Sequence, residues 1–266
     1  MVQTASPLAA TADPISDAVL SPEASLLARN LLQMVLAHSA GAPPILVATM
    51  QALLANVLMN DYWNWWNPAF PATIADAQNA INAAMNLNPP DPVRALVCHA
   101  QGLVHRANGQ HNPARKAFRE AKRLNSSFAR AHAQFGNQKS YMDRLDEVQD
   151  PLDKAISLGQ RPATAYFYWG KGRGFFLQKD WPNAIDWLQR SAYALEGVWY
   201  TRCYLAAAQY TAGDANAARR TMQDFLNDPR FGRPVLARAV AALANQTGVP
   251  SLDAARKTVH DFLQQF

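Results

Sequence analysis

Residues 95–124, ALVCHAQGLVHRANGQHNPARKAFREAKRL, contain two runs of helix-forming residues separated by a short polar turn. The turn is Ala107-Asn108-Gly109-Gln110, and asparagine followed by glycine is a typical helix stop signal. In the first run Gly102 lets a second helix approach closely, and in the second run Ala114 and Phe118 lie one turn apart. The stretch therefore predicts a hairpin of two packed helices.

The same residue types recur along the chain at a nearly constant interval. Small residues are spaced by 34, 36 and 34 residues, at Gly102, Gly136, Gly172 and Ala206. Two further sets keep these spacings: the large apolar Phe118, Leu152, Leu188 and Met222, and the mostly small Ala114, Val148, Ala184 and Ala218. No alternating strand pattern of useful length interrupts them. The spacing predicts an all-α protein in which helix hairpins repeat and stack.

We call each of these three sets of equivalent positions a column. The columns resemble the tetratricopeptide repeat (TPR), whose unit is a helix hairpin of 34 residues. The best matches are Gly102, Gly109, Ala114, Phe118, Ala121 and Leu124, and then Gly172, Phe175, Trp181, Ala184 and Leu188. Gln101 and Lys171 depart from the family pattern, and the unit 129–160 is the weakest because Asp143-Arg144 replaces its glycine turn. The resemblance implies an α-solenoid of about four TPR-like hairpins with terminal helices.

A narrower resemblance covers Trp169 to Leu226, about a quarter of the chain. The run DWPNAIDWL at 180–188, followed by LAAA at 205–208 and Gly213-Asp214, is similar to repeat domains at the C-terminus of bacterial adenylate-cyclase-like signalling proteins and related winged-helix regulators. In those proteins the repeats are a sensory or protein-interaction part. The resemblance implies such an interaction role here.

Outside the matched repeats the chain divides into further segments. Residues 1–20 predict a mobile arm, and Ser21-Pro22-Glu23 predicts the first helix start, with a serine cap before a proline. For residues 21–93 the sequence predicts N-terminal helices and an irregular hairpin, whose two helices are Pro44–Asn60 and Ile74–Leu87. Residues 94–228 hold the matched repeats, and 229–266 predict capping helices at 232–246 and 251–265.

A segment rich in tryptophan lies between the helices of the irregular hairpin. Asp61–Thr73 contains Trp63, Trp65 and Trp66 and is predicted to be a loop. It either folds back as a plug over the N-terminal hairpins, which we favour, or is exposed as a docking or dimerisation element.

Composition and charge limit the function classes. Of the 266 residues, 49% are hydrophobic and 17% charged, which excludes a charge-rich disordered chain. The net charge of +5 is divided unevenly: residues 1–93 hold one base and six acids, and residues 94–266 hold 24 bases and 14 acids. This asymmetry favours an acidic partner for the second part. The sequence leaves the oligomeric state open.

No residue pattern predicts catalysis, a cofactor or a metal site. The six histidines form no His-Glu-x-x-His motif, and Cys98 and Cys203 lie three repeats apart, too far to bridge. Gly170-Lys171-Gly172-Arg173-Gly174 resembles a phosphate loop in composition, but it falls inside a predicted helix with no strand before it. Three glycines weaken a helix, so either close helix contact or a ligand at the backbone should compensate.

Binding is therefore the predicted function. In a TPR superhelix the first helix of each repeat lines a concave groove, and the residues pointing away from the packing columns are rich in aromatics and arginine, the residue types that dominate binding energy. The predicted groove residues are His99, Arg106, Arg130, Asn137, Tyr166, Trp169, Arg173, Phe176, Tyr200 and Tyr210. An equally weighted alternative is that the C-terminal helices cover these aromatics.

Two other binding functions stay open. A basic patch on one helix, Arg115, Lys116, Arg119, Lys122 and Arg123, predicts either a solvated outer face or contact with nucleic acid or an acidic surface. The groove could alternatively hold a small molecule. No stretch is long and apolar enough to span a membrane, and no charged segment precedes the first apolar residues as in a secretory signal, so the expected location is the cytoplasm.

Overall fold

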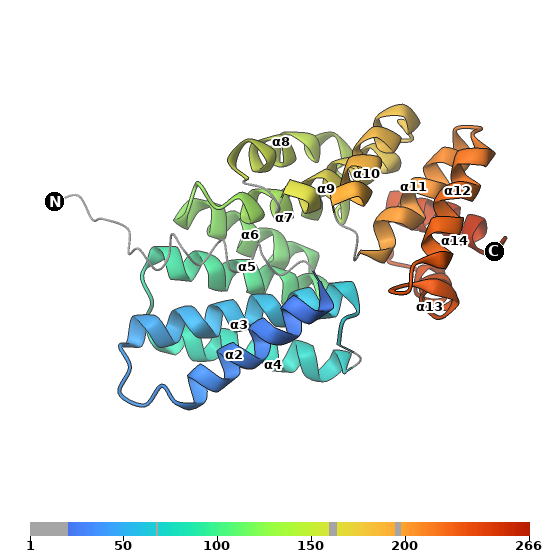
Figure 1. The fold of residues 1–266 in the computed structure, drawn as a ribbon. Helices are drawn as coiled ribbons and strands as arrows, with labels where there is room; N and C mark the ends of the chain where they lie inside the picture. The colour runs from blue at the N-terminus through green and yellow to red at the C-terminus, as the bar shows by residue number, and fades with distance from the viewer. Residues whose placement is uncertain (1–20, 68, 160–163, 195–197) are drawn as a thin grey trace. The chain divides into compact units, whose positions relative to one another are not determined.

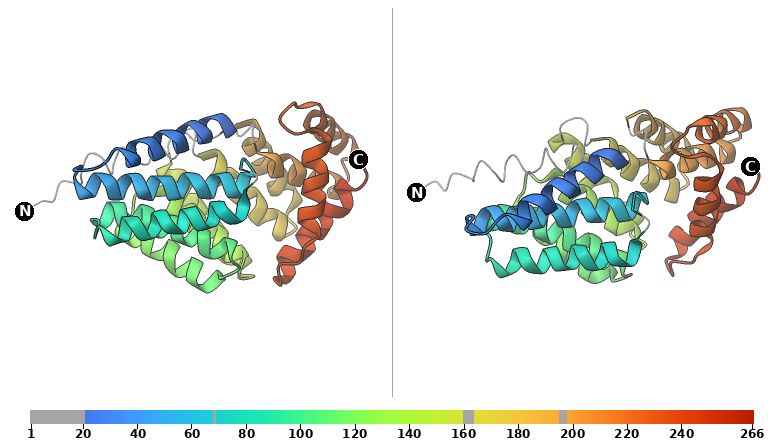
Figure 2. Two further views of the ribbon diagram at one scale, coloured as in Figure 1. Left: turned by 90° about the horizontal axis from the view of Figure 1, so that it is seen from below. Right: turned by 60° about the horizontal axis from the view of Figure 1, so that its bottom comes forward.

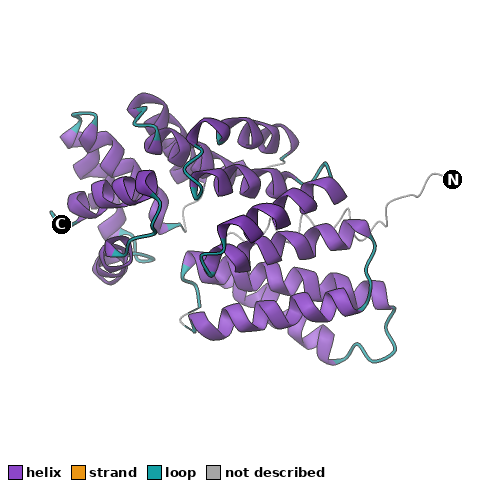
Figure 3. Cartoon of the chain, turned by 180° about the vertical axis from the view of Figure 1, so that it is seen from behind, coloured by secondary structure: helices purple, strands orange, loops and turns teal. Residues whose placement is uncertain are grey.

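The computed structural model describes residues 21–67, 69–159, 164–194 and 198–266. These residues form α-helices and one short 3-10 helix, without a strand among them (Figure 3). The all-α prediction is confirmed. The predicted arm at residues 1–20 lies outside the described residues.

The chain forms two compact units. Unit 1 ends at Phe135, and unit 2 comprises Gly136–Phe266, so the division lies inside α7 (Ala129–Ser140). It therefore falls within the predicted repeat segment 94–228 and does not follow the borders of the sequence pattern.

Unit 1 contains α2 (Pro22–Ala37), α3 (Pro44–Asn64), α4 (Phe70–Asn86), α5 (Asp91–Ala107) and α6 (His111–Leu124) (Figure 1). The predicted serine cap is present, because the Ser21 hydroxyl accepts a hydrogen bond of 3.1 Å from the amide of Ala24. Helix α3 is apolar on most sides and packs against α2, α4 and α5. It is the centre of the core of unit 1.

The predicted loop at Asp61–Thr73 is wrong at both ends. Asp61–Asn64 continue α3, and Phe70 begins α4. Helix α3 ends at Trp65, whose backbone is left-handed (φ 61°). Trp63 therefore sits on a helix and packs against the core, while Trp65 and Trp66 follow the helix end and are half-buried.

The repeating columns are core columns. Phe118, Leu152, Leu188 and Met222 are fully buried, and so are their small companions Ala114, Val148, Ala184 and Ala218. A Cβ placed on Gly102 would lie 2.4 Å from the Phe118 ring, so α5 approaches α6 as closely as the sequence predicts. The predicted helix pairing is present in this hairpin, whereas a TPR solenoid stays a prediction.

Unit 2 continues from the end of α7 through η1 (Leu145–Glu147), α8 (Gln149–Leu158), α9 (Thr164–Leu177) and α10 (Trp181–Ala194). It ends with α11 (Trp199–Thr211), α12 (Ala215–Asn227), α13 (Gly232–Ala244) and α14 (Pro250–Leu263). The two predicted terminal helices are present with ends shifted by one or two residues, and α14 packs against α9, α11 and α13.

None of the helices in the described ranges combines the length and the apolar character that crossing a membrane requires.

Candidate functional site

The three glycines of α9 let neighbouring helices of unit 2 touch its backbone. A Cβ on Gly170 would lie 2.7 Å from Asn137 Oδ1, and one on Gly172 would lie 2.7 Å from Leu188 Cγ. On Gly174 it would lie 2.7 Å from Gln149 Nε2. Of the two expected reasons for these glycines, close helix contact is therefore the one that the structure displays.

Arg173 extends from this tightly packed helix into the unit. One terminal nitrogen donates a hydrogen bond of 3.2 Å to the Tyr141 hydroxyl, and the other donates to Ser140 Oγ and, at 3.5 Å, to the Asn137 carbonyl. The guanidinium also lies 4.8 Å from the centre of the Tyr141 ring. The side chain is only 7% exposed, and no aspartate or glutamate of the described chain forms an ion pair with it.

Aromatic rings of α9 and α11 pack on one another near this guanidinium, whose charge acts on Tyr200 and Tyr204. The Trp169 ring lies 4.5 Å from the Tyr200 ring and 5.0 Å from the Tyr204 ring, centre to centre. Tyr166, Trp169 and Tyr200 are half-buried, so part of each remains accessible. We call Tyr141, Tyr166, Trp169, Arg173, Tyr200 and Tyr204 the Arg173 cluster.

Two tyrosine hydroxyls of this cluster, those of Tyr200 and Tyr204, are held in the neutral form. Burial raises the pKa of Tyr200 well above its usual range, and Tyr166 and Tyr141 raise it further, while Arg173 opposes the shift. Burial likewise raises the pKa of Tyr204. The cluster thus combines a buried cation with neutral hydroxyl groups, which suits the binding of an anionic group. It does not suit proton abstraction by tyrosinate.

The predicted groove residues of unit 1 are buried. His99 is 2% exposed and contacts the rings of Phe118 and Phe128, so its predicted position in a groove is wrong. Arg106 donates 2.6 Å and 2.9 Å hydrogen bonds to the side chain and carbonyl of Gln134, and therefore braces α5 against α7. Arg130 is also buried.

The remaining groove residues are dispersed within unit 2. Asn137 is half-buried and lies against Gly170, and Phe176 is fully buried between Trp181 and Tyr204. Tyr210 is exposed and packs on Phe262 of α14. The structure thus brings Tyr166, Trp169, Arg173 and Tyr200 together. It adds Tyr204, which the sequence analysis missed although it lies one helical turn after Tyr200.

The basic patch of α6 is on the outer surface of unit 1. Lys116, Arg119 and Arg123 are exposed, while Arg115 and Lys122 are half-buried. Arg123 forms a bidentate pair with Glu120, at 2.8 Å and 2.7 Å, which lowers the pKa of that carboxyl. The charges avoid the Ala114, Phe118 and Ala121 core face, as predicted.

The cysteines are not arranged for nucleophilic chemistry. Both are free thiols, as predicted. Burial raises the pKa of Cys98 to about 11, and burial raises that of Cys203 far above its usual range. A thiol must ionise to act as a nucleophile, so both would be inert near neutral pH. Within the described residues no group of histidine, cysteine and acidic side chains could hold a metal ion.

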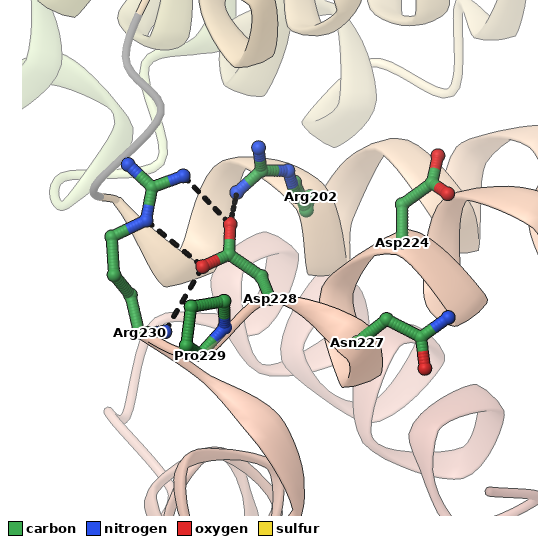
Figure 4. Close-up of a pocket in the computed structure, with 6 residues that line it drawn as sticks. All are labelled: Arg202, Asp224, Asn227, Asp228, Pro229 and Arg230. Carbon is green, nitrogen blue, oxygen red and sulfur yellow. Dashed lines mark hydrogen bonds and ion pairs between the residues drawn. The ribbon is translucent and has the colours of Figure 1, made fainter.

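An open depression of about 580 Å³ lies at the C-terminal end of α12 in unit 2 (Figure 4). Asp228 lies at its centre, with Arg230 at 2.7 Å and Arg202 at 3.5 Å. Hydrogen bonds from Arg230 hold the pKa of Asp228 below its usual value. The Asp228 carboxylate already pairs with the guanidinium groups of Arg202 and Arg230, so these three charges stabilise the end of α12 and leave one another compensated. The Arg173 cluster is therefore the stronger candidate site.

No protein-family model matches the chain, and no curated protein matches it.

Proposed function

We propose that the chain is a non-catalytic interaction protein that binds an acidic segment of a partner protein at the Arg173 cluster, as a scaffold or sensory adaptor in bacterial signalling. The observation that carries this proposal is the buried guanidinium of Arg173, which has no carboxylate partner in the described chain and is bordered by half-buried aromatic rings.

Burying a charge away from water costs several kcal/mol unless an opposite charge compensates it. In the Arg173 cluster only neutral oxygens and one ring face compensate the guanidinium. A carboxylate from a partner would therefore gain a charge-assisted hydrogen bond in a site of low dielectric constant. The rings of Trp169 and Tyr200 would receive an apolar neighbour of that carboxylate. Tryptophan, tyrosine and arginine are the residue types that most often dominate such interfaces.

Trp169→Ala is expected to weaken partner binding about 30-fold, because loss of a central tryptophan typically costs about 2 kcal/mol. Peptides are first selected from a random phage-displayed library against the whole chain, and their affinities are then measured by fluorescence polarisation. We expect the selected peptides to share an Asp, a Glu or a free C-terminal carboxylate beside an apolar residue.

Tyr193→Ala is the matched control, because Tyr193 is a 90% exposed aromatic of the same unit that lies outside the cluster. Tyr200→Phe keeps the ring and removes only the hydroxyl, so it should cause a smaller loss. Far-UV circular dichroism shows whether each variant folds. Peptides without an acidic group, or equal affinities for Trp169→Ala and Tyr193→Ala, would contradict the proposed function.

The exposed bases of α6 support a second candidate, binding of a nucleic acid. Lys116, Arg119 and Arg123 are exposed on one helix, with Glu120 as the acid among them. Affinity that depends on neutralised phosphates falls steeply with salt. The one aromatic residue of α6, Phe118, is fully buried, so the helix itself offers no ring for stacking on bases.

Lys116→Glu combined with Arg119→Glu should abolish the binding of a fluorescein-labelled DNA duplex if this second function is correct. The wild-type affinity should also fall by orders of magnitude between roughly 50 and 200 mM salt. The matched control is Arg219→Glu with Arg220→Glu, two exposed bases on α12. Equal effects of both double variants would indicate only nonspecific attraction to a basic protein.

A further inference from the structure

Helix α2 exposes an unusual amount of apolar surface. Five of its side chains are 42–60% exposed, namely Leu26, Leu27, Leu31, Met34 and Val35. The exposed large hydrophobic residues elsewhere in the described chain are Ile45, Met85, Tyr193 and Tyr210. Isolated exposed apolar residues are normal on a protein surface, but a concentration on one helix marks a contact surface.

The opposite face of α2 attaches the helix to its own unit. Ser25 donates a hydrogen bond to the buried carboxylate of Asp61 on α3, and Arg29 pairs with the same carboxylate at 2.5 Å. Leu32 and Leu36 pack on the core beside these groups. Figure 2 shows α2 along the outer side of α3 at the edge of unit 1. The exposed residues are thus a second apolar face, separate from the one that folding uses.

This outer face is formed by Leu27, Leu31 and Met34, which follow one another at helical spacing. At 100° per residue they point away from Ser25, Arg29, Leu32 and Leu36, and Leu26 and Val35 flank them on either side. Glu23 lies at one end of the face and His38 at the other, both exposed. Between these two ends the outer face contains no charged residue.

The order of residues on this face makes it complementary to itself. If two copies of α2 lie antiparallel around a two-fold axis that passes between Asn30 and Leu31, Leu27 of one copy faces Met34 of the other. Glu23 then faces His38, and the two copies of Leu31 meet beside the axis. A two-fold interface requires this relation, in which residue i contacts j and j contacts i. Two antiparallel helices also align their dipoles favourably.

The size of the face fits a reversible dimer. Half of each of five large side chains amounts to on the order of 400–500 Å² per protomer, against about 800 Å² per partner in a standard interface. This is enough for association in the micromolar range and too little for a permanent assembly.

We propose that the protein forms a homodimer through antiparallel pairing of α2 from two copies. The inference stands apart from the proposed partner binding, because the Arg173 cluster lies in unit 2 and the α2 face in unit 1.

Sedimentation equilibrium of the whole chain should detect a monomer–dimer equilibrium at micromolar concentration. Leu27→Asp combined with Leu31→Asp should shift the dissociation constant at least 100-fold, because two carboxylates would be buried in an apolar contact. Met85→Asp, at an apolar residue of α4 that is 43% exposed, is the matched control and should leave dimerisation unchanged. A wild-type chain that stays monomeric, or a dimer that survives the double variant, would overturn the proposal.

Cysteine crosslinking tests the register without destabilising the helix. Leu31→Cys should form an intermolecular disulfide with itself on mild oxidation, because the two copies meet beside the axis. Leu27→Cys alone should not, since its two copies would be offset by about 10 Å along the helices. A mixture of Leu27→Cys and Met34→Cys should crosslink. The wild-type chain, whose Cys98 is half-buried and whose Cys203 is buried, gives the background. A Leu27→Cys homodimer with no mixed product would overturn the antiparallel register.

Discussion

Gly102→Ala is expected to lower the free energy of unfolding of unit 1 by about 3 kcal/mol. A Cβ at this position would lie 2.4–2.7 Å from three carbons of the Phe118 ring. The ring is fully buried and cannot turn away, so α5 and α6 would have to separate. Alanine favours the helix by about 1 kcal/mol over glycine, and the strain must exceed this gain. A mutation that improves helix propensity would thus destabilise the protein.

Urea denaturation followed by circular dichroism measures this loss as a lower transition midpoint. Hydrogen exchange locates it, because the amides of α5 and α6 should lose protection more than those of unit 2. Gln101→Ala is the control, since it changes a half-buried neighbour on the same helix.

A double mutant shows whether the ring is the cause. Phe118→Leu removes Cε1 and Cζ, two of the three ring carbons that the new methyl group would contact, so Gly102→Ala should cost less in the Phe118→Leu background. An unchanged midpoint for Gly102→Ala, or an equal loss in both backgrounds, would contradict the proposed role of the glycine column.

The helix pairing of α5 and α6 could be predicted from sequence because its packing is encoded locally. A small residue opposite a large one, at a fixed separation along the chain, describes a helix crossing directly. Gly102 and Phe118 meet as that pattern requires, and the glycines of α9 likewise mark close approaches to other helices. Helix ends marked by a capping residue and a proline, such as Ser21 and Pro22, could also be predicted from the sequence.

The extension of α3 through Asp61–Asn64 could not be predicted from local sequence signals. Its anchors are Ser25 and Arg29, more than thirty residues earlier in the chain. Such a long-range polar contact leaves no periodic trace in the sequence.

The candidate site was predictable only in part, because the burial of its residues also depends on segments far away in the sequence. Helical spacing places Tyr166, Trp169 and Arg173 on one side of α9, and the structure keeps them together. Helical spacing also predicted surface positions for His99 and Phe176. Whether a side chain is exposed depends, however, on which other helices pack against it. Asn56 and the rings of Phe118 and Phe128 enclose His99, and these residues belong to three other helices or turns.

Acidification from pH 7 to pH 4.5 is expected to destabilise unit 1 by about 2–3 kcal/mol through His99 alone. The pKa of His99 is lowered from 6.5 to about 3, first by burial and then by the positive charges of Arg130 and Arg106. Below pH 6.5 the unfolded chain binds a proton at this residue and the folded chain does not. The stability is therefore fully present above pH 6.5 and is lost progressively as the pH falls toward 3.

The hydrogen bonds around His99 explain why the ring stays neutral. Asn56 Nδ2 donates to the carbonyls of Ala52 and Leu96, which orients its oxygen toward His99 Nδ1 at 2.5 Å. Nδ1 therefore carries the proton and donates it to that oxygen. The other nitrogen, Nε2, is buried without a hydrogen-bond partner. A second proton there would have no acceptor and would lie near two guanidinium groups.

His99→Gln isolates this contribution from the carboxyl groups that also titrate in acid. The glutamine amide can still donate to Asn56 but has no proton to gain, so the urea midpoint of the variant should fall less steeply between pH 7 and pH 4.5. The variant should be the less stable protein at pH 7, since it packs less well against Phe128, and the two curves should converge in acid. His105→Gln, at a histidine that bonds Gln110 near the surface, is the matched control for replacing a histidine by glutamine outside the enclosed site. Parallel pH profiles for the wild type and His99→Gln would show that His99 is protonated as readily in the folded protein as in the unfolded chain, and would contradict the neutral, enclosed ring.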